Sequence, residues 1–191
     1  MSERMAYPKA FLPFNTTHNF IEQILVEYQL AACNKQVLVL NHALNTTYWQ
    51  KKLSNISAQG IICWNNKPAK GRLYSIAIGL EVFEEAIPVF IQNVDQPFIT
   101  HQDISKMMLA YTNKSYCQPI NNNLKAHPVL INPEMASLIK KKHSSHASLK
   151  TVLQDFKVTL VPVNNSKINV NINSLPDYKT HFAALSKMTE R

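Results

Sequence analysis

The chain has 191 residues, 46% of them hydrophobic, and carries a formal net charge of +8. This length and apolar content suffice for one buried core, so we predict a single domain over residues 1–191, and the positive charge favours anionic partners such as nucleotides, phosphates or nucleic acid. The three cysteines are widely spaced, which argues against a disulfide framework and a zinc site. The N-terminus lacks a signal-peptide layout, and no apolar run reaches the about 20 residues that span a bilayer. These features predict a cytoplasmic protein.

The first half of the chain alternates between helical and strand patterns. Apolar residues recur at helical spacing from Phe20 to Ala32, after Thr16 and Thr17 as candidate caps, and a continuous apolar run follows at residues 36–41. The same pattern predicts further helices near 46–53 and 75–83, and further strands at 60–64 and 87–93. Strands that are apolar along their whole length are typical of a parallel sheet covered on both faces, so the pattern predicts an α/β fold.

The alternation is less regular in the second half of the chain. Thr100 is a candidate cap for a helix over 101–111, and Pro133 opens a short helix that runs to Lys141. The remaining predicted elements are strands near 116–120, 129–132, 158–163 and 170–173, helices at 149–156 and from Pro176 onward, and a polar surface loop at 140–146.

A carboxylate follows the predicted strand at 87–93. Open α/β sheets bind ligands beyond the carboxyl ends of their strands, and Asp95 in that position is a suitable single anchor for Mg²⁺. The alternative is that Asp95 caps the turn that follows.

The N-terminal segment carries Ser2, Arg4 and Lys9. Two cations at this spacing can neutralise a triphosphate as pyrophosphate leaves. Taken alone, however, a basic N-terminal segment is more often a disordered tail.

Three further segments hold candidate binding residues. Gly71 enters the helix that carries Ser75, where amides and a hydroxyl can meet a base or phosphate, although an ordinary helix start explains the segment nearly as well. His127 is either a core imidazole or a donor in a substrate pocket, and the structural role is the commoner one for a lone histidine. Asn171 and Asn173 offer amide oxygens for metal or ribose contacts but are by default turn formers.

In their order and spacing, these segments resemble the MobA/MocA-like NTP transferases, the family of molybdenum-cofactor guanylyl- and cytidylyltransferases, over nearly the whole chain. The family motif Ser-x-Arg-Met-Gly-x-x-Lys-x-x-Leu-Pro is matched by Ser2, Arg4, Met5, Lys9, Leu12 and Pro13. Later matches are Gly71 and Ser75, Asp95-Gln96-Pro97, His127-Pro128-Val129, and Asn171-Ile172-Asn173-Ser174 followed by Pro176 and Asp177.

The resemblance implies a Rossmann-like, three-layer α/β/α nucleotidyltransferase fold with a mostly parallel central sheet. It implies a Mg²⁺-dependent reaction in which a phosphate of the acceptor attacks the α-phosphorus of an NTP and releases pyrophosphate. Asp95-Gln96-Pro97 and His127-Pro128-Val129 favour CTP over GTP modestly. Molybdopterin is the implied acceptor, although relatives in the wider superfamily use sugar phosphates, phosphocholine or isoprenoid precursors.

The resemblance also assigns roles to individual residues. Arg4 and Lys9 hold the triphosphate, with Ser2 at the turn, and are counted with Asp95 as the catalytic group. Gly71 and Ser75 contact the nucleotide. Asp95 ligates Mg²⁺, with Asn173 as a weaker second ligand, and His127 faces the acceptor.

Three departures from the family pattern bear on activity. The family's first strand and its Leu-Ala-Gly-Gly turn have no counterpart, so we expect an N-terminally truncated domain with unpaired ladder groups on two neighbouring strands. Ala6 replaces a glycine, and Asn171 and Asn173 stand where many relatives carry Asp.

These departures leave a second hypothesis open, a catalytically degenerate relative that binds a molybdoenzyme or its insertion chaperone. A third, a nucleic-acid-binding domain, depends on charge alone and is disfavoured because the basic residues are dispersed.

Overall fold

The computed structural model describes residues 7–83, 86–142 and 148–183. Its helices are α1 (Phe20–Leu30), α2 (Thr47–Ser57), α3 (Gly71–Leu80), α4 (His101–Ala110), α5 (Pro133–Lys142), α6 (Leu149–Leu153) and α7 (Leu175–His181), with 3-10 turns η1 (Lys9–Phe11), η2 (His42–Leu44) and η3 (Pro68–Lys70). Its strands are β1 (Val37–Asn41), β2 (Ile61–Asn65), β3 (Val89–Ile91), β4 (Ser115–Asn121), β5 (Leu124–Lys125), β6 (Val129–Ile131) and β7 (Lys157–Pro162). None of the helices in these ranges is both long and apolar enough to cross a membrane.

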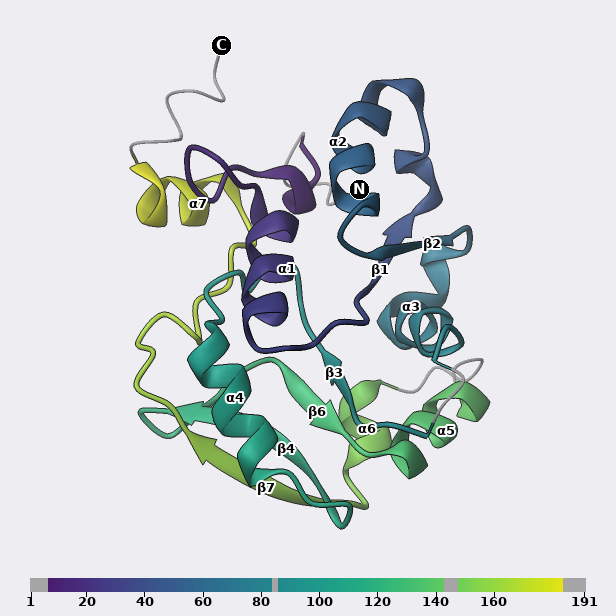
Figure 1. The fold of residues 1–191 in the computed structure, drawn as a ribbon, viewed down its shortest axis with the longest axis vertical. Coiled ribbons are helices and arrows are strands. Elements are labelled where there is room, and N and C mark those ends of the chain that lie inside the picture. The colour runs from purple at the N-terminus through teal and green to yellow at the C-terminus, as the bar shows by residue number, and fades with distance from the viewer. Residues whose placement is uncertain (1–6, 84–85, 143–147, 184–191) are drawn as a thin grey trace.

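The strands form two sheets rather than the single, mostly parallel sheet that the resemblance implies (Figure 1). β1 pairs with β2 in parallel, and β4 pairs with β7 in parallel, but β3 with β6, β6 with β4, and β4 with β5 are antiparallel. The α/β fold is therefore confirmed and the parallel arrangement holds only in part.

The antiparallel part of the larger sheet follows from short connections. Asn122 and Asn123 have φ of 49° and 62° and turn the chain directly from β4 into β5. Both residues tolerate the left-handed conformation that a tight hairpin requires. β6 follows within a few residues, too few for a crossover helix, so it must run opposite to β4.

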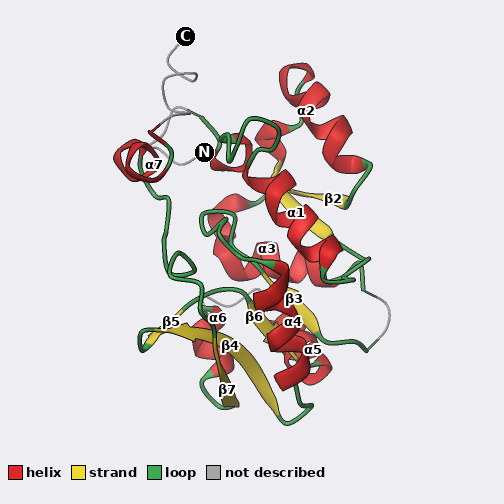
Figure 2. Ribbon diagram, turned by 60° about the vertical axis from the view of Figure 1, so that its left-hand side comes forward, coloured by secondary structure: helices red, strands yellow, loops and turns green. Residues whose placement is uncertain are grey.

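Side-chain alternation along the strands places helices on both faces of the sheets. Leu38 and Leu40 of β1 pack in one cluster with α1 and α2, whereas a Cβ added to Gly79 of α3 would lie 3.0 Å from Val39. In β6, Leu130 packs with Met107 of α4, and its neighbours pack with α3, α5 and α6. Helices α1, α2 and α4 therefore cover one face and α3, α5 and α6 the other. Figure 2 shows the strands with helices packed around them.

β1 and β3 each present an edge without a ladder partner among the described residues. The two sheets are joined by packing instead, because Val94, just past β3, contacts three of the hydrophobic clusters.

Two local expectations are wrong. The side chain of Asn19, not Thr16 or Thr17, caps α1 by accepting a hydrogen bond from the amide of Glu22 in a capping box. Residues 170–173 form no strand, because they lie against the turn at Asp95 and lead into α7. Part of the expected loop at 140–146 lies outside the described residues, and its start belongs to α5.

Candidate functional site

Three side chains from distant parts of the sequence meet at the end of β3. Lys9 Nζ donates a hydrogen bond of 3.0 Å to Asn173 Oδ1 and lies 3.9 Å from Asp95 Oδ2. The Lys9 side chain is 16% exposed and that of Asp95 30%, so the group lies at the surface but is partly shielded from water. We call Lys9, Asp95 and Asn173 the charged triad.

Local packing holds each member of the charged triad in place. Lys9 opens η1, whose Phe11 is buried and stacks on Trp49 at 4.8 Å. The backbone carbonyl of Asp95 accepts a 2.8 Å hydrogen bond from the amide of Ile172, which is fully buried. The backbone therefore places Asn173 directly beside the Asp95 turn.

The start of α7 contributes a second carboxylate near Lys9. Asp177 accepts hydrogen bonds from the backbone amides of Asn173 and Ser174 at 2.9 Å. The pKa of Asp177 is lowered, first by a hydrogen bond with the Ser174 side chain, then by those with the two amides, and also by the positive charge of Lys9. A negative charge is thus fixed beside the triad by the cap of the helix.

The segment with Gly71 and Ser75 is fixed by a residue that the sequence did not single out. Gly71 has φ of 82°, which lets the chain turn from η3 into α3 without strain. Asn65, buried at the end of β2, donates through Nδ2 to Ser75 Oγ at 2.9 Å and accepts from the amide of Lys67. The sequence signal that could have identified Asn65 is its position directly after an apolar run.

His127 lies in a low-polarity environment and is affected by two charged side chains. Desolvation, followed by the positive charge of Arg72, lowers the pKa of His127 from its usual 6.5 to about 4, against the opposing effects of a backbone hydrogen bond with Ile91 and the charge of Asp95. Its Nδ1 is buried and has no hydrogen-bond partner among the described residues. His127 is therefore neutral at pH 7.

Arg72 is the second residue that sequence reasoning missed, although it stands between Gly71 and Ser75. Desolvation lowers the pKa of Arg72 and the charge of Asp95 raises it. Arg72 thus acts electrostatically on both Asp95 and His127.

The remaining predicted residues are Ser2, Arg4 and Asn171. Ser2 and Arg4 lie outside the described residues. Asn171 is exposed and donates to the backbone carbonyl of Asn169 at 3.3 Å.

The charged triad fits a magnesium site in which the protein supplies only part of the metal's ligands. No group of three or more His, Cys, Asp or Glu side chains suited to a metal occurs in the described part of the chain. Asp95 and Asn173 nevertheless supply oxygen atoms, the donors that Mg²⁺ prefers when water and substrate phosphates complete its octahedron. The residues therefore fit a metal that binds together with a phosphate ligand.

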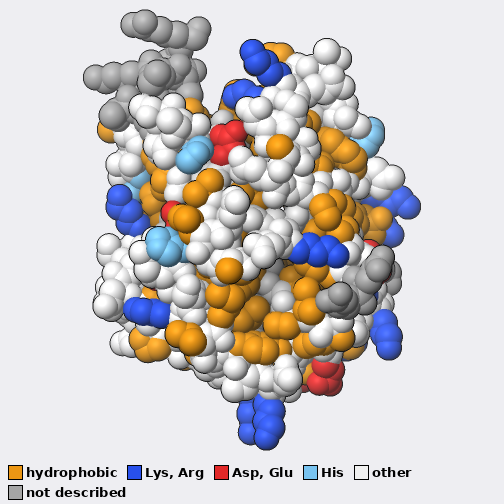
Figure 3. Space-filling view, in the orientation of Figure 1, with side chains coloured by type: hydrophobic (Ala, Val, Ile, Leu, Met, Phe, Trp, Pro, Cys, Tyr) orange, Lys and Arg blue, Asp and Glu red, His pale blue; other side chains and the backbone are white. Residues whose placement is uncertain are grey.

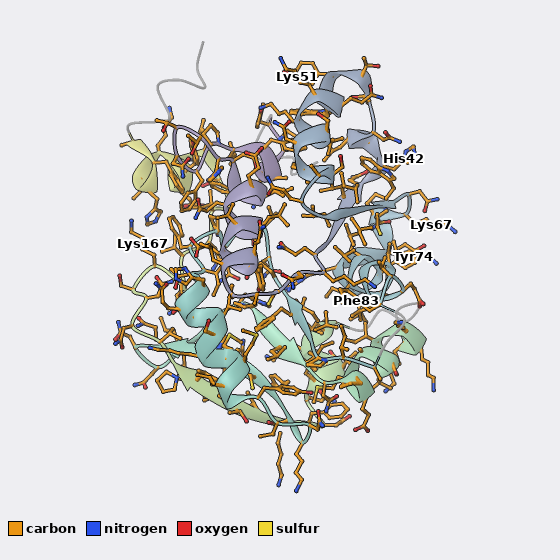
Figure 4. The ribbon with its side chains drawn as sticks, viewed as in Figure 1. His42, Lys51, Lys67, Tyr74, Phe83 and Lys167 are labelled. Carbon is orange, nitrogen blue, oxygen red and sulfur yellow. The ribbon has the colours of Figure 1, made fainter. Side chains whose placement is uncertain are left out.

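The pKa of His127 leads to a stability prediction. Between pH 6.5 and 4 the unfolded chain binds a proton at this histidine more readily than the folded chain does, so stability falls as the pH is lowered. Between pH 7 and 5, we expect His127 to account for a loss of about 2 kcal/mol in the free energy of unfolding. Urea denaturation at both pH values should show a smaller loss in His127→Gln, while His42→Gln, a change at an exposed site (Figure 4), should match the parent. An unchanged loss in His127→Gln would contradict this.

A family model matches most of the chain. The model of the MobA-like NTP transferase domain matches residues 1–161. No curated protein matches the sequence significantly.

Solved structures share the fold at low sequence identity. Rv0371c from Mycobacterium tuberculosis superposes with a TM-score of 0.76 at 15% identity, covering 94% of this chain and 92% of that one, and a further Rv0371c structure is a manganese complex. Molybdopterin-guanine dinucleotide biosynthesis protein A from Archaeoglobus fulgidus superposes with a TM-score of 0.65 at 17% identity, covering 98% and 95%. The 4-diphosphocytidyl-2C-methyl-D-erythritol synthase from Anaerococcus prevotii gives 0.69 at 13% identity, covering 97% and 95%.

Proposed function

The chain belongs to the MobA-like NTP transferase family, and from this we propose that it is a Mg²⁺-dependent nucleotidyltransferase that transfers NMP from an NTP to a phosphorylated acceptor. We further propose CTP over GTP as the nucleotide, molybdopterin as the acceptor, a single domain over residues 1–191, and a cytoplasmic reaction. The observation that carries the proposal is the charged triad, a lysine, a carboxylate and an amide oxygen gathered at the end of β3.

The reaction needs alignment and charge neutralisation more than a dedicated base. A phosphate oxygen of the acceptor is already an anion, and it forms the new bond to the α-phosphorus while the bond to the β-phosphate oxygen breaks and pyrophosphate leaves. When bound, Mg²⁺ supplies positive charge at the phosphate oxygens. Asp95 and Asn173 would hold it.

Lys9 has the most direct part in binding the triphosphate. Its ammonium donates to Asn173 and lies near Asp95. Because Lys9 carries its ammonium on a flexible stem, it could turn from these oxygens to the phosphates when Asp95 and Asn173 hold the metal. We propose Arg4 and Ser2 as its companions at the triphosphate, and Gly71 and Ser75 as contacts to the nucleoside.

The names of the fold neighbours support this reaction type. One neighbour is named for a guanine dinucleotide of molybdopterin and another for a cytidylyl product, so both nucleotides occur on this fold. The manganese complex of a third neighbour supports a divalent cation. The charge distribution supports a small-molecule substrate, since Lys and Arg are scattered over the face in Figure 3 and do not form a stripe that would follow a nucleic acid backbone.

Calorimetric titration with Mg-CTP and Mg-GTP tests the proposal. We expect saturable binding of one nucleotide that requires Mg²⁺. We expect Lys9→Ala to raise its Kd by about 10- to 100-fold, because a charge-assisted contact to the triphosphate is lost.

Lys51→Ala is the matched control for Lys9→Ala. It removes an exposed lysine from α2 (Figure 4) and should leave the Kd within about twofold of the parent. A folded parent that binds neither nucleotide, or a Lys9→Ala chain that binds as the parent does, would contradict the proposal.

A second candidate function is a non-catalytic relative that binds a molybdoenzyme or its insertion chaperone. The observation that favours it is that β1 and β3 each have an edge without a ladder partner among the described residues, where another chain could add a strand. This candidate predicts a folded protein without pyrophosphate release for any pair of NTP and acceptor. Measurable release would exclude it.

A further inference from the structure

We propose that Asn65 is a positioning residue for nucleotide recognition, because it directs the proton of the Ser75 hydroxyl toward an acceptor atom of the nucleoside. The inference rests on the proposed function, which places Ser75 at the nucleoside, and it adds the residue that sets the direction of this contact. Neither the sequence analysis nor the family match assigns a role to Asn65.

A backbone group fixes the orientation of the Asn65 side chain. Asn65 ends β2 and is only 3% exposed, and its Oδ1 accepts a 2.8 Å hydrogen bond from the amide of Lys67. A backbone amide can only donate, so the oxygen of the side chain must be the atom that faces Lys67. The nitrogen therefore faces α3, where Nδ2 donates to Ser75 Oγ at 2.9 Å.

Hydroxyl groups in other helices donate their proton to their own helix. Ser105 of α4 donates to the backbone carbonyl four residues earlier, and Thr180 of α7 does the same. Among the residues that the structure describes, the Ser75 hydroxyl has a hydrogen bond from Asn65 and no acceptor for its own proton. One lone pair of Ser75 Oγ is thus occupied, and the O–H group remains to donate to a bound molecule.

The position of this pair suits a nucleoside. Asn65 lies at the carboxyl end of β2, and ligands of open α/β sheets bind beyond the carboxyl ends of the strands. Ser75 is half-buried, and Leu73 of the same helix belongs to one buried cluster with Ile91 of β3. The hydroxyl is therefore partly shielded from water. The acceptors that a nucleoside offers it are the ribose oxygens and the carbonyl oxygen and ring nitrogens of the base.

Asn65→Asp reverses the hydrogen bond with little change in side-chain size. The carboxylate still accepts from the Lys67 amide but cannot donate, so it takes the Ser75 proton and the nucleoside loses its donor. In calorimetric titrations with the Mg-nucleotide that the parent binds, we expect Asn65→Asp to raise the Kd about 10-fold and Ser75→Ala about 3- to 10-fold. Asn55→Asp adds the same charge at an exposed position of α2 and should stay within about twofold of the parent.

A double-mutant cycle shows whether Asn65 acts through Ser75. In the Ser75→Ala background the hydroxyl is already gone, so Asn65→Asp should raise the Kd by less than about a further twofold. A general structural role of Asn65, or repulsion between the new carboxylate and the phosphates, would weaken binding by the same factor in both backgrounds. That result would overturn the inference, as would unchanged nucleotide binding by Ser75→Ala.

Inorganic tripolyphosphate with Mg²⁺ locates the contact, because it carries the phosphates without a nucleoside. Its Kd should agree within about twofold among the parent, Asn65→Asp and Ser75→Ala, which would also show that the variants are folded. An equal loss for tripolyphosphate and nucleotide would show that Asn65 shapes the phosphate site, and the nucleoside role would be wrong.

The same titrations separate this inference from the proposed function. If the folded parent binds no nucleotide, the proposed function fails and the role of Asn65 fails with it. If the parent binds nucleotide and Asn65→Asp binds it equally well, the role of Asn65 alone is refuted.

Discussion

Replacing Asp95 by Ala is expected to reduce pyrophosphate release about 100- to 1000-fold, with the Mg-nucleotide and molybdopterin as substrates. Asp95 is the carboxylate of the charged triad, and its side chain is 30% exposed. Asn173 alone offers a neutral oxygen, which is a weak ligand for a hard dication. The variant should therefore lose the Mg²⁺ dependence of nucleotide binding together with turnover.

The same variant should respond in the opposite direction when the metal is absent. Lys9 Nζ lies 3.9 Å from Asp95 Oδ2 in the parent, so removing the carboxylate removes a competitor for the ammonium. In EDTA, Asp95→Ala should bind CTP or GTP at least as tightly as the parent. A far-UV circular dichroism spectrum that matches the parent would show that a loss of binding comes from the missing metal ligand and not from misfolding.

Asp155→Ala provides the matched control for Asp95→Ala. Asp155 is an exposed carboxylate between α6 and β7, and no hydrogen bond or ion pair joins it to the residues described. Its removal should leave pyrophosphate release and its Mg²⁺ dependence unchanged. If Asp95→Ala retains metal-dependent binding at the level of Asp155→Ala, the metal role of Asp95 is wrong.

The sequence predicted element type well because local signals were consistent with one another. Thr100 caps α4 as expected, in a capping box with Asp103, and continuous apolar runs became β1 and β2. Strand direction was not predictable from those runs. Strand direction depends on where the chain reverses. In the larger sheet, two asparagines between β4 and β5 form the turn that reverses the chain.

The candidate site was predictable only in part. Asp95 could be predicted from its place after an apolar strand. The hydrogen bond between Lys9 and Asn173 could not, because it spans 164 positions and depends on how both ends of the chain fold together. Arg72 was overlooked because its neighbours Gly71 and Ser75 matched a motif and it did not. Its electrostatic effects on Asp95 and His127 arise only in the folded chain.

A single aromatic cluster keeps the two ends of the site together. It consists of Phe14, Phe20, Phe98, Tyr178 and Phe182. Tyr178 adds a hydrogen bond of 2.9 Å from its hydroxyl to the backbone carbonyl of Pro13. The cluster thereby fixes the segment that carries Asn173 against the segment that carries Lys9.

Phe20→Ala is expected to lower the free energy of unfolding by about 3 to 5 kcal/mol, because a fully buried ring is replaced by a cavity. Urea denaturation followed by circular dichroism measures the change, with Tyr48→Ala as a control that truncates a ring already 76% exposed. In the folded variant, weaker packing of α7 should also loosen Asn173 from Lys9, so nucleotide affinity should fall with stability. A loss below about 1 kcal/mol would show that the cluster collapses around the deletion, and the packing could then not be what positions the triad.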